Sequence, residues 1–166
     1  GATLWTHAAG FSSIASSSPF GSVLLAPANG VTAFRLPSGS GRPEVLWREN
    51  RLATATASPV IHQGHVYVVN RAGVLKCGNL STGEIELEKR LGGAYWATPV
   101  AVGNRRYAAT DAGQVSVIAL EEKGKGLAKI DFGERLQATP AGDGDAIYFR
   151  SDEHLWKVAP SGDGAG

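Results

Sequence analysis

Ala57-Ser-Pro-Val-Ile-His-Gln-Gly64 and the following His65-Val-Tyr-Val-Val-Asn70 form one unit of a repeat in this chain of 166 residues. A hydroxyl residue and a proline open the unit, and a polar-Gly pair separates its two apolar runs. That pattern predicts two short strands joined by a tight hairpin. The hydroxyl-Pro pair recurs with spacings of 40, 40 and 41 residues, starting at Ser18, Ser58, Thr98 and Thr139. The chain is therefore read as four units of about 40 residues.

Each unit continues with a second tight turn and two further strands. Three of these turns end in glycine, which supplies the positive φ that a hairpin needs: Ala28-Asn-Gly30, Arg71-Ala-Gly73 and Asp111-Ala-Gly113, with Ser151-Asp-Glu-His154 as a degenerate fourth. Third strands are expected over 31–34, 74–77, 114–120 and 155–158, and fourth strands over 44–47, 84–91 and 128–132. Four antiparallel strands in 40 residues predict an all-β fold, a propeller with four blades in the chain.

The fourth unit lacks its last strand, and the N-terminus carries an unassigned one. Thr3-Leu-Trp5-Thr-His7 resembles the fourth-strand pattern of Val45-Leu-Trp47-Arg. We therefore expect the N-terminal strand to close the last blade, either within one chain or, in a dimer with eight blades, in the partner chain. The predicted domain covers residues 1–160, and residues 161–166 are expected to form a flexible tail.

Composition excludes several classes of protein. The 16 Lys and Arg residues nearly balance the 15 Asp and Glu residues, so no general nucleic-acid surface is expected. One cysteine makes neither a disulfide framework nor a cysteine-based zinc site. No apolar run is long enough for a membrane span, and residues 1–20 lack the pattern of a signal peptide.

At this point the chain resembles the quinoprotein (PQQ-like) repeat family from about Thr3 to Pro160. The second unit is the clearest copy, and its Asn79-Leu-Ser-Thr-Gly83-Glu84 is similar to the motif by which tryptophans dock one blade onto the next. Leu87 stands where that tryptophan is usual, whereas Trp47 keeps its place in the first unit. In the third unit a charged version, Glu121-Glu-Lys-Gly124, replaces the motif. The resemblance implies rings of about eight blades and extracytoplasmic bacterial proteins.

The family includes both dehydrogenases and purely binding or assembly proteins. The resemblance implies that its enzymes need a vicinal Cys–Cys disulfide, a calcium cluster and a catalytic Asp. Because Cys77 stands alone, we expect no PQQ cofactor and no activity of that kind.

Residues that could carry chemistry are sparse. His62 and His65 flank the predicted Gln63-Gly64 hairpin and are read as turn residues, and Asp143-Gly-Asp145 is read as another hairpin rather than a calcium loop. Cys77 is read as a small core residue. Searches for nucleophile, phosphate-loop and metal-hydrolase motifs fail, so no catalytic residue and no metal site are predicted.

A ligand is expected at the loops that share one edge of the blades, around the mouth of the channel. The candidate ligand-binding residues there are Asn50, Arg51, Asn70, Arg71, Tyr95, Trp96, Asp111, Arg150 and Asp152. Tyr95 and Trp96 are interpreted as a stacking platform, with packing between blades as the alternative for Trp96.

The function predicted from these features is a non-catalytic binding or scaffold module for a protein or a small ligand. The alternatives are a structural propeller fragment that assembles into a larger ring, with a second copy as partner, and a quinoprotein-type oxidoreductase. Nucleic acid and membrane are not expected as partners.

Overall fold

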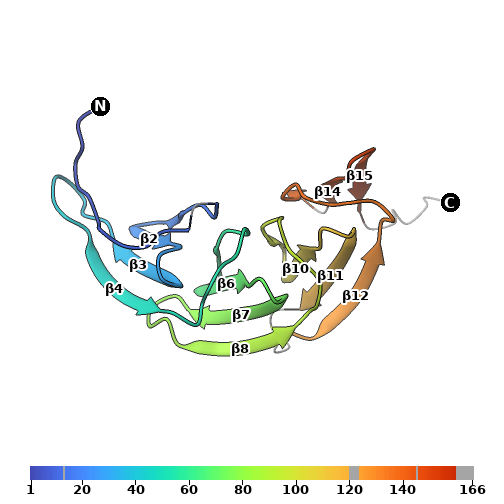
Figure 1. Ribbon diagram of the computed structural model, residues 1–166, viewed down its shortest axis with the longest axis horizontal. Helices are drawn as coiled ribbons and strands as arrows, with labels where there is room; N and C mark the ends of the chain where they lie inside the picture. The colour runs from blue at the N-terminus through green and yellow to red at the C-terminus, as the bar shows by residue number, and fades with distance from the viewer. Residues whose placement is uncertain (13, 120–123, 145, 160–166) are drawn as a thin grey trace. The chain divides into compact units, whose positions relative to one another are not determined.

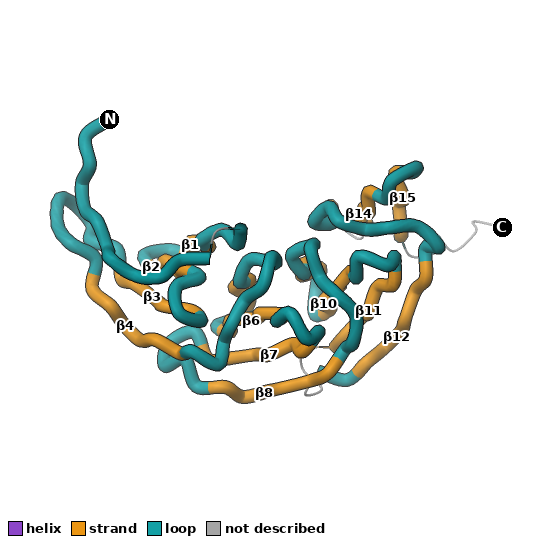
Figure 2. The backbone as a smooth tube through the Cα atoms, viewed as in Figure 1, coloured by secondary structure: helices purple, strands orange, loops and turns teal. Residues whose placement is uncertain are grey.

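The computed structural model describes residues 1–12, 14–119, 124–144 and 146–159. Within these ranges the chain forms fifteen strands and no helix (Figures 1 and 2). Every strand pairs antiparallel with its sequence neighbour, so the predicted all-β fold is confirmed. The chain divides into two compact units, Gly1–Tyr95 and Trp96–Gly166, which are described separately.

Unit 1 contains two sheets of four strands in sequence order. The first sheet consists of β1 (Ser18–Phe20), β2 (Val23–Ala26), β3 (Val31–Arg35) and β4 (Glu44–Glu49). The second consists of β5 (Val60–His62), β6 (His65–Val69), β7 (Val74–Asn79) and β8 (Ile85–Arg90). Each first strand has three residues and each fourth strand has six.

Unit 2 contains one sheet of four strands and one of three. The third sheet consists of β9 (Val100–Val102), β10 (Arg105–Ala109), β11 (Gln114–Ala119) and β12 (Gly126–Asp131). The fourth consists of β13 (Ala141–Asp143), β14 (Ala146–Arg150) and β15 (Leu155–Val158). Each sheet has the strand order expected of one propeller blade.

The hydroxyl-Pro pairs that revealed the repeat connect one sheet to the next. Ser58 Oγ accepts a hydrogen bond of 2.9 Å from the Ser16 amide, and Thr139 Oγ1 accepts one of 3.1 Å from the Thr98 amide. Proline has no amide proton for the ladder, and β5, β9 and β13 each begin directly after it. The hydroxyl therefore links neighbouring blades, which explains why the pair recurs once per unit.

The Gln63-Gly64 pair turns as the sequence predicts. Both residues have positive φ, 47° and 74°, and His62 pairs directly with His65 across the turn. Positive φ at both central residues is the mark of a two-residue hairpin whose twist matches its strands.

The core of unit 1 lies between its two sheets. Leu25, Val31 and Val66 are fully buried in one apolar cluster that also includes Trp47. The Trp47 indole donates a hydrogen bond of 2.8 Å to the Leu80 carbonyl, and a Cβ on Gly83 would lie 2.7 Å from the indole ring. Trp47 thus docks the first blade onto the Asn79–Gly83 turn of the second, as the resemblance implied.

The core of unit 2 is built around Phe149 on β14. Its ring lies 5.0 Å from that of Phe132, which in turn lies 5.2 Å from Trp156. Val115 and Leu136 are buried in the same cluster. Apolar residues of two sheets therefore share one core in this unit as well.

The strand predicted over residues 3–7 is not formed in this structure. Residues 1–8 have no regular structure, and the rings of Trp5 and His7 lie 6.3 and 4.8 Å from Phe34 on β3. A β-strand needs a partner strand for its backbone hydrogen bonds. In this structure the N-terminal segment instead packs its aromatic rings against the first sheet. Closure of the last blade by this segment stays a prediction.

Five sequence predictions lie wholly or partly outside the described residues: the last residue of the strand expected over 114–120, most of the 121–124 motif, Asp145, the last residue of the domain 1–160, and the tail 161–166.

Candidate binding site at the turn edge

Two kinds of loop meet at one edge of each blade, which we call the turn edge. It consists of the turn between the second and third strands and the segment that follows the fourth strand. A Cβ on Gly30 would collide with the main chain of Glu49 and Asn50, and one on Gly73 would lie 2.7 Å from the Gly93 carbonyl oxygen. Since both glycines also have positive φ, the repeat requires glycine at this close approach.

A pocket of about 440 Å³ opens at the turn edge of the first blade. Three segments line it: Gly10, Phe11 and Ser12; Pro27, Asn29 and Gly30; and Ala53 with Thr54. Residues 10–12 are fixed there because the Ser12 amide donates to the Pro27 carbonyl and the Asn29 amide to the Gly10 carbonyl. The Phe11 side chain is 46% exposed. The pocket therefore offers main-chain polar groups and one accessible aromatic ring.

Four of the predicted site residues lie on the turn edge of unit 1. Asn50 and Arg51 are exposed and follow β4 beside Gly30. Arg71 is also exposed, whereas the Asn70 side chain accepts hydrogen bonds of 3.0 Å from the Ala72 and Val74 amides. Asn70 thus shapes its own turn, whereas Asn50 and the two arginines face solvent.

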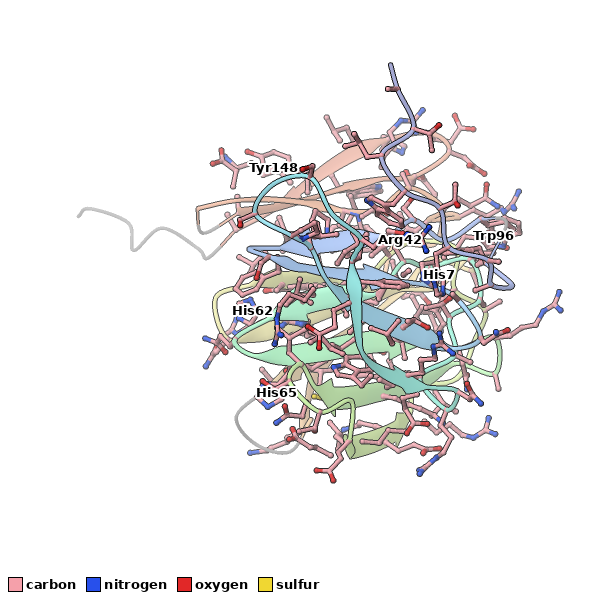
Figure 3. All side chains as sticks on the ribbon, turned by 90° about the vertical axis from the view of Figure 1, so that its left-hand side faces the viewer. His7, Arg42, His62, His65, Trp96 and Tyr148 are labelled. Carbon is pink, nitrogen blue, oxygen red and sulfur yellow. The ribbon has the colours of Figure 1, made fainter. Side chains whose placement is uncertain are left out.

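The two predicted aromatics differ in accessibility. Tyr95 is 4% exposed, and its carbonyl accepts a hydrogen bond of 2.5 Å from Thr56 Oγ1. Trp96, labelled in Figure 3, is 50% exposed. The expectation that both rings form a stacking surface is therefore corrected: burial removes Tyr95, and the Trp96 indole alone presents a surface.

Three predicted residues belong to the turn edge of unit 2. Asp111 accepts hydrogen bonds from Arg135, at 3.3 Å, and from Gln137, at 2.8 Å. Arg150 and Asp152 are exposed at the start of the last turn. The carboxylate of Asp111 is thus already neutralised within the unit, which leaves it less suited to recognise a cation.

A polar cluster that the sequence did not reveal surrounds Glu134. The Ser151 hydroxyl donates to one carboxylate oxygen at 2.5 Å, and His154 Nδ1 lies 2.7 Å from the other. The hydrogen bond from Ser151, followed by the bond and charge of His154, keeps the pKa of Glu134 below its usual range, against the effect of burial.

These three residues do not have the geometry of a nucleophilic triad. Ser151 donates directly to the carboxylate, and the imidazole of His154 also contacts the carboxylate. In a triad the histidine stands between the hydroxyl and the acid. Ser151 Oγ also accepts from the Trp156 indole at 3.0 Å, so the cluster braces the last turn.

Residues 10–12 and 53–54 of the pocket were missed because they belong to no strand of the repeat. No apolar alternation or turn signal marks them, and their contacts with 27–30 arise only in the folded chain.

The residues present do not fit the PQQ cofactor of the dehydrogenases. Cys77 is the single cysteine, and its buried side chain on β7 has no adjacent cysteine with which to form the vicinal disulfide.

Comparison with known families decides the relationship. The family model of the outer membrane protein assembly factor BamB matches residues 1–127. The chain belongs to this family. The predicted resemblance to PQQ-like propeller proteins is thereby confirmed. Among curated proteins no sequence match is found.

Two solved structures show the same fold. BamB from Moraxella catarrhalis is 17% identical, with a TM-score of 0.71 over 93% of this chain and 47% of its own. The computationally designed Ika4 protein is 13% identical, with a TM-score of 0.78 over 96% of this chain and 98% of its own. The propeller architecture is therefore confirmed, and the chain spans about half the length of the Moraxella BamB.

Among the described residues there is no helix with the length and apolarity to cross a membrane.

Proposed function

We propose that this BamB-family chain is a non-catalytic binding module that holds an extended, acidic segment of a partner protein at the turn edge of unit 1. The pocket of about 440 Å³ between residues 10–12, 27–30 and 53–54 carries the proposal. Its size falls in the range of ligand pockets, and its rim combines an apolar ring with main-chain donors and acceptors. Such a surface suits a peptide better than a compact polar metabolite.

The charges around the pocket favour an acidic segment. Arg51 lies two residues before Ala53, which lines the pocket, and Arg71 lies on the turn between the second and third strands of the second blade. Guanidinium groups bind carboxylates through paired hydrogen bonds. Phe11 adds an apolar contact, so an Asp or Glu next to an aromatic or aliphatic residue would satisfy both groups.

The family supports a protein as partner. BamB is described as an outer membrane protein assembly factor. This likeness supports an extracytoplasmic location as part of the proposal, in which the partner segment would belong to another extracytoplasmic protein.

A display library of random short peptides tests the binding function. We expect selected peptides to be rich in Asp and Glu and to bind with micromolar affinity. Phe11→Ser and Arg51→Glu should each weaken that binding at least tenfold, whereas Arg90→Glu, an exposed change on β8, should not. Recovery of no peptide, or equal binding by Arg51→Glu, would contradict the proposal.

A second candidate, self-assembly into a larger ring, rests on the fourth sheet. It has three strands, and its last strand, β15, carries Leu155 with 71% of its surface exposed. An edge strand with an exposed apolar residue favours addition of another strand. The described residues of this sheet include no fourth strand, residues 3–7 of a second copy have the sequence expected of one, and Leu4 is 83% exposed.

Light scattering during gel filtration tests the assembly. Two chains of 17.3 kDa should travel together, and removal of residues 1–7 should yield a single chain. A wild-type mass near one chain would exclude self-assembly while leaving the peptide experiment unaffected.

A further inference from the structure

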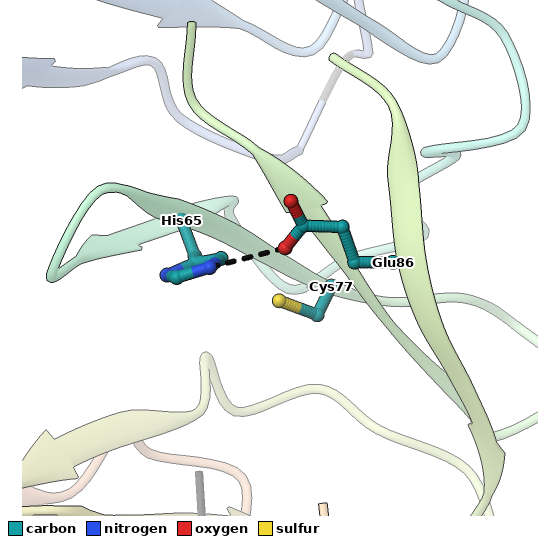
Figure 4. A group of neighbouring side chains, drawn as sticks. All are labelled: His65, Cys77 and Glu86. Carbon is teal, nitrogen blue, oxygen red and sulfur yellow. Dashed lines mark ion pairs between the residues drawn. The ribbon is translucent and has the colours of Figure 1, made fainter. Parts of the chain in front are cut away.

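Three possible metal ligands from three strands of the second sheet converge on one point. His65 lies on β6, Cys77 on β7 and Glu86 on β8, and Figure 4 shows their side chains directed toward one another. Their ligand atoms all lie within 4.8 Å of each other, and His65 Nε2 is 3.0 Å from Glu86 Oε2. The set combines a nitrogen, a sulfur and an oxygen.

A β-bulge is the reason why Glu86 belongs to this group. Cys77 pairs with Leu87, but the next residue, Gly78, pairs with Ile85, so Glu86 is an extra residue on β8. In a regular strand, neighbours such as Glu86 and Leu87 would point to opposite faces. The bulge re-aims the side chain, which lets the carboxylate reach the face that carries His65 and Cys77.

The first and third sheets have the same bulge but different residues. The positions of His65, Cys77 and Glu86 correspond to Val23, Ala33 and Leu46 in the first sheet and to Arg105, Val117 and Leu127 in the third. In the first sheet Ala33 is buried in the core cluster, and Val23 and Leu46 pack against it. Apolar side chains at these three positions are therefore sufficient for the packing of a blade. The second sheet instead has three side chains whose nitrogen, sulfur and oxygen atoms can bind a metal.

Hydrogen bonds orient the two outer ligands. His65 Nδ1 lies 2.8 Å from the Gln63 carbonyl oxygen, which can only accept, so this nitrogen carries a proton and Nε2 is directed at Glu86. The other Glu86 oxygen accepts a hydrogen bond of 3.1 Å from the Asn79 amide group. A histidine that donates one ring N–H to a carbonyl is the usual arrangement of a metal ligand.

We propose that His65, Cys77 and Glu86 bind a divalent transition-metal ion of the Zn²⁺ class. Tetrahedral zinc keeps nitrogen, sulfur and oxygen ligands about 3.3 to 3.6 Å apart. The His65–Glu86 pair is already as close as this, at 3.0 Å, and the separations from Cys77 Sγ, at most 4.8 Å, need to shorten by no more than about 1.5 Å. Cys77 is 6% exposed and forms the floor, while the His65 and Glu86 side chains are 38% and 42% exposed and leave a path for the ion. Water completes the fourth position.

Binding balances in charge and protons. The ion binds the lone pair of His65 Nε2, the Glu86 carboxylate and the Cys77 thiolate, so any proton on these atoms must leave. The protons leave to solvent, so binding weakens as the pH falls.

Titration of the purified, reduced chain with Co²⁺ tests the site. One Co²⁺ per chain should produce a sulfur-to-cobalt charge-transfer band and the visible bands of tetrahedral cobalt, and Zn²⁺ should displace it. Cys77→Val, which copies the third sheet, should abolish the charge-transfer band. Glu86→Gln should weaken the binding of Co²⁺ at least tenfold. Because Glu86 is exposed, this substitution should not prevent folding.

Glu88→Gln is the matched control. Glu88 lies on the same strand, two residues further on, and is paired with Lys76 at 3.5 Å. It should bind Co²⁺ as the wild type does. Absence of the charge-transfer band in the wild type, its persistence in Cys77→Val, or equal weakening by Glu86→Gln and Glu88→Gln would overturn the proposal.

Discussion

Two turns of unit 2 hold the same residue, Glu134, in different ways. The 110–113 turn approaches its main chain so closely that a Cβ on Gly113, whose φ is +93°, would collide with the Glu134 carbonyl oxygen. The 151–154 turn has no glycine and binds the Glu134 carboxylate instead, through Ser151 and His154. Equivalent turns of the repeat can therefore hold the same residue in two ways. The 110–113 turn does so by close main-chain contact, and the 151–154 turn by hydrogen bonds and charge.

Replacement of Gly113 by alanine should have the largest effect on this pair of contacts. The new Cβ meets main-chain atoms, which cannot move aside as a flexible side chain can, and the backbone conformation is unfavourable for alanine as well. We expect the free energy of unfolding in urea to fall by about 3 to 5 kcal/mol.

Gly103→Ala is the control for that experiment. Gly103 also has positive φ, +58°, but its Cβ would meet nothing within 4 Å. Its loss should be about 1 to 2 kcal/mol, the cost of the left-handed conformation alone. Equal losses in the two variants would show that the close approach to Glu134 does not matter.

Most of the fold could be predicted because its signals are local. The polar-Gly hairpins and the apolar alternation report on neighbouring residues, and the observed β6, β7 and β15 begin at the residues expected from them. The N-terminal segment could not be placed in this way. Its sequence resembles a fourth strand, but whether it pairs depends on which edge is available, and in this structure Phe34 binds its aromatic rings instead.

Removal of the Ser151 hydroxyl should have an intermediate effect. Ser151 is 4% exposed, and its oxygen accepts from the Trp156 indole and the His154 amide while it donates to Glu134. Ser151→Ala leaves these groups without their partner, for which we expect a loss of about 1 to 3 kcal/mol in urea unfolding. Ser40→Ala, in an exposed loop, should be indistinguishable from wild type; an equally silent Ser151→Ala would contradict the bracing role of the hydroxyl.

The candidate sites were less predictable than the fold because they depend on long-range geometry. His65 and Glu86 are far apart in sequence, and no spacing rule reveals that a bulge turns Glu86 toward the histidine. The sequence correctly places the backbone of His65 beside the hairpin turn, but it does not indicate what the imidazole ring contacts. Tyr95 shows the opposite error: an aromatic residue in a loop between two blades was expected to be exposed, but its ring is buried.

The two partners of Glu134 should differ in their influence on its pKa. Because the Ser151 hydrogen bond is the largest cause of the lowered pKa, Ser151→Ala should raise it toward the usual value more than His154→Gln does. Carboxyl NMR shifts followed through an acid titration measure both variants. The reverse order would mean that the charge of His154, rather than the hydroxyl, dominates the turn.

The smallest expected effect is on the pH dependence of stability, and it separates the two turns most cleanly. A carboxylate whose pKa is lowered by folding stabilises the folded state above its unfolded pKa, about 4.3 for glutamate, and this contribution disappears as the pH falls through the lowered value. The Tm advantage of wild type over Glu134→Gln should therefore be present at pH 7 and vanish in acid. In a Ser151→Ala background the Tm advantage should be smaller and disappear at higher pH.

The loss of stability caused by Gly113→Ala should be the same at pH 7 and in acid, because the collision that it introduces involves no titrating group. A loss that changes with pH would show that the Gly113 turn also acts through the Glu134 carboxylate.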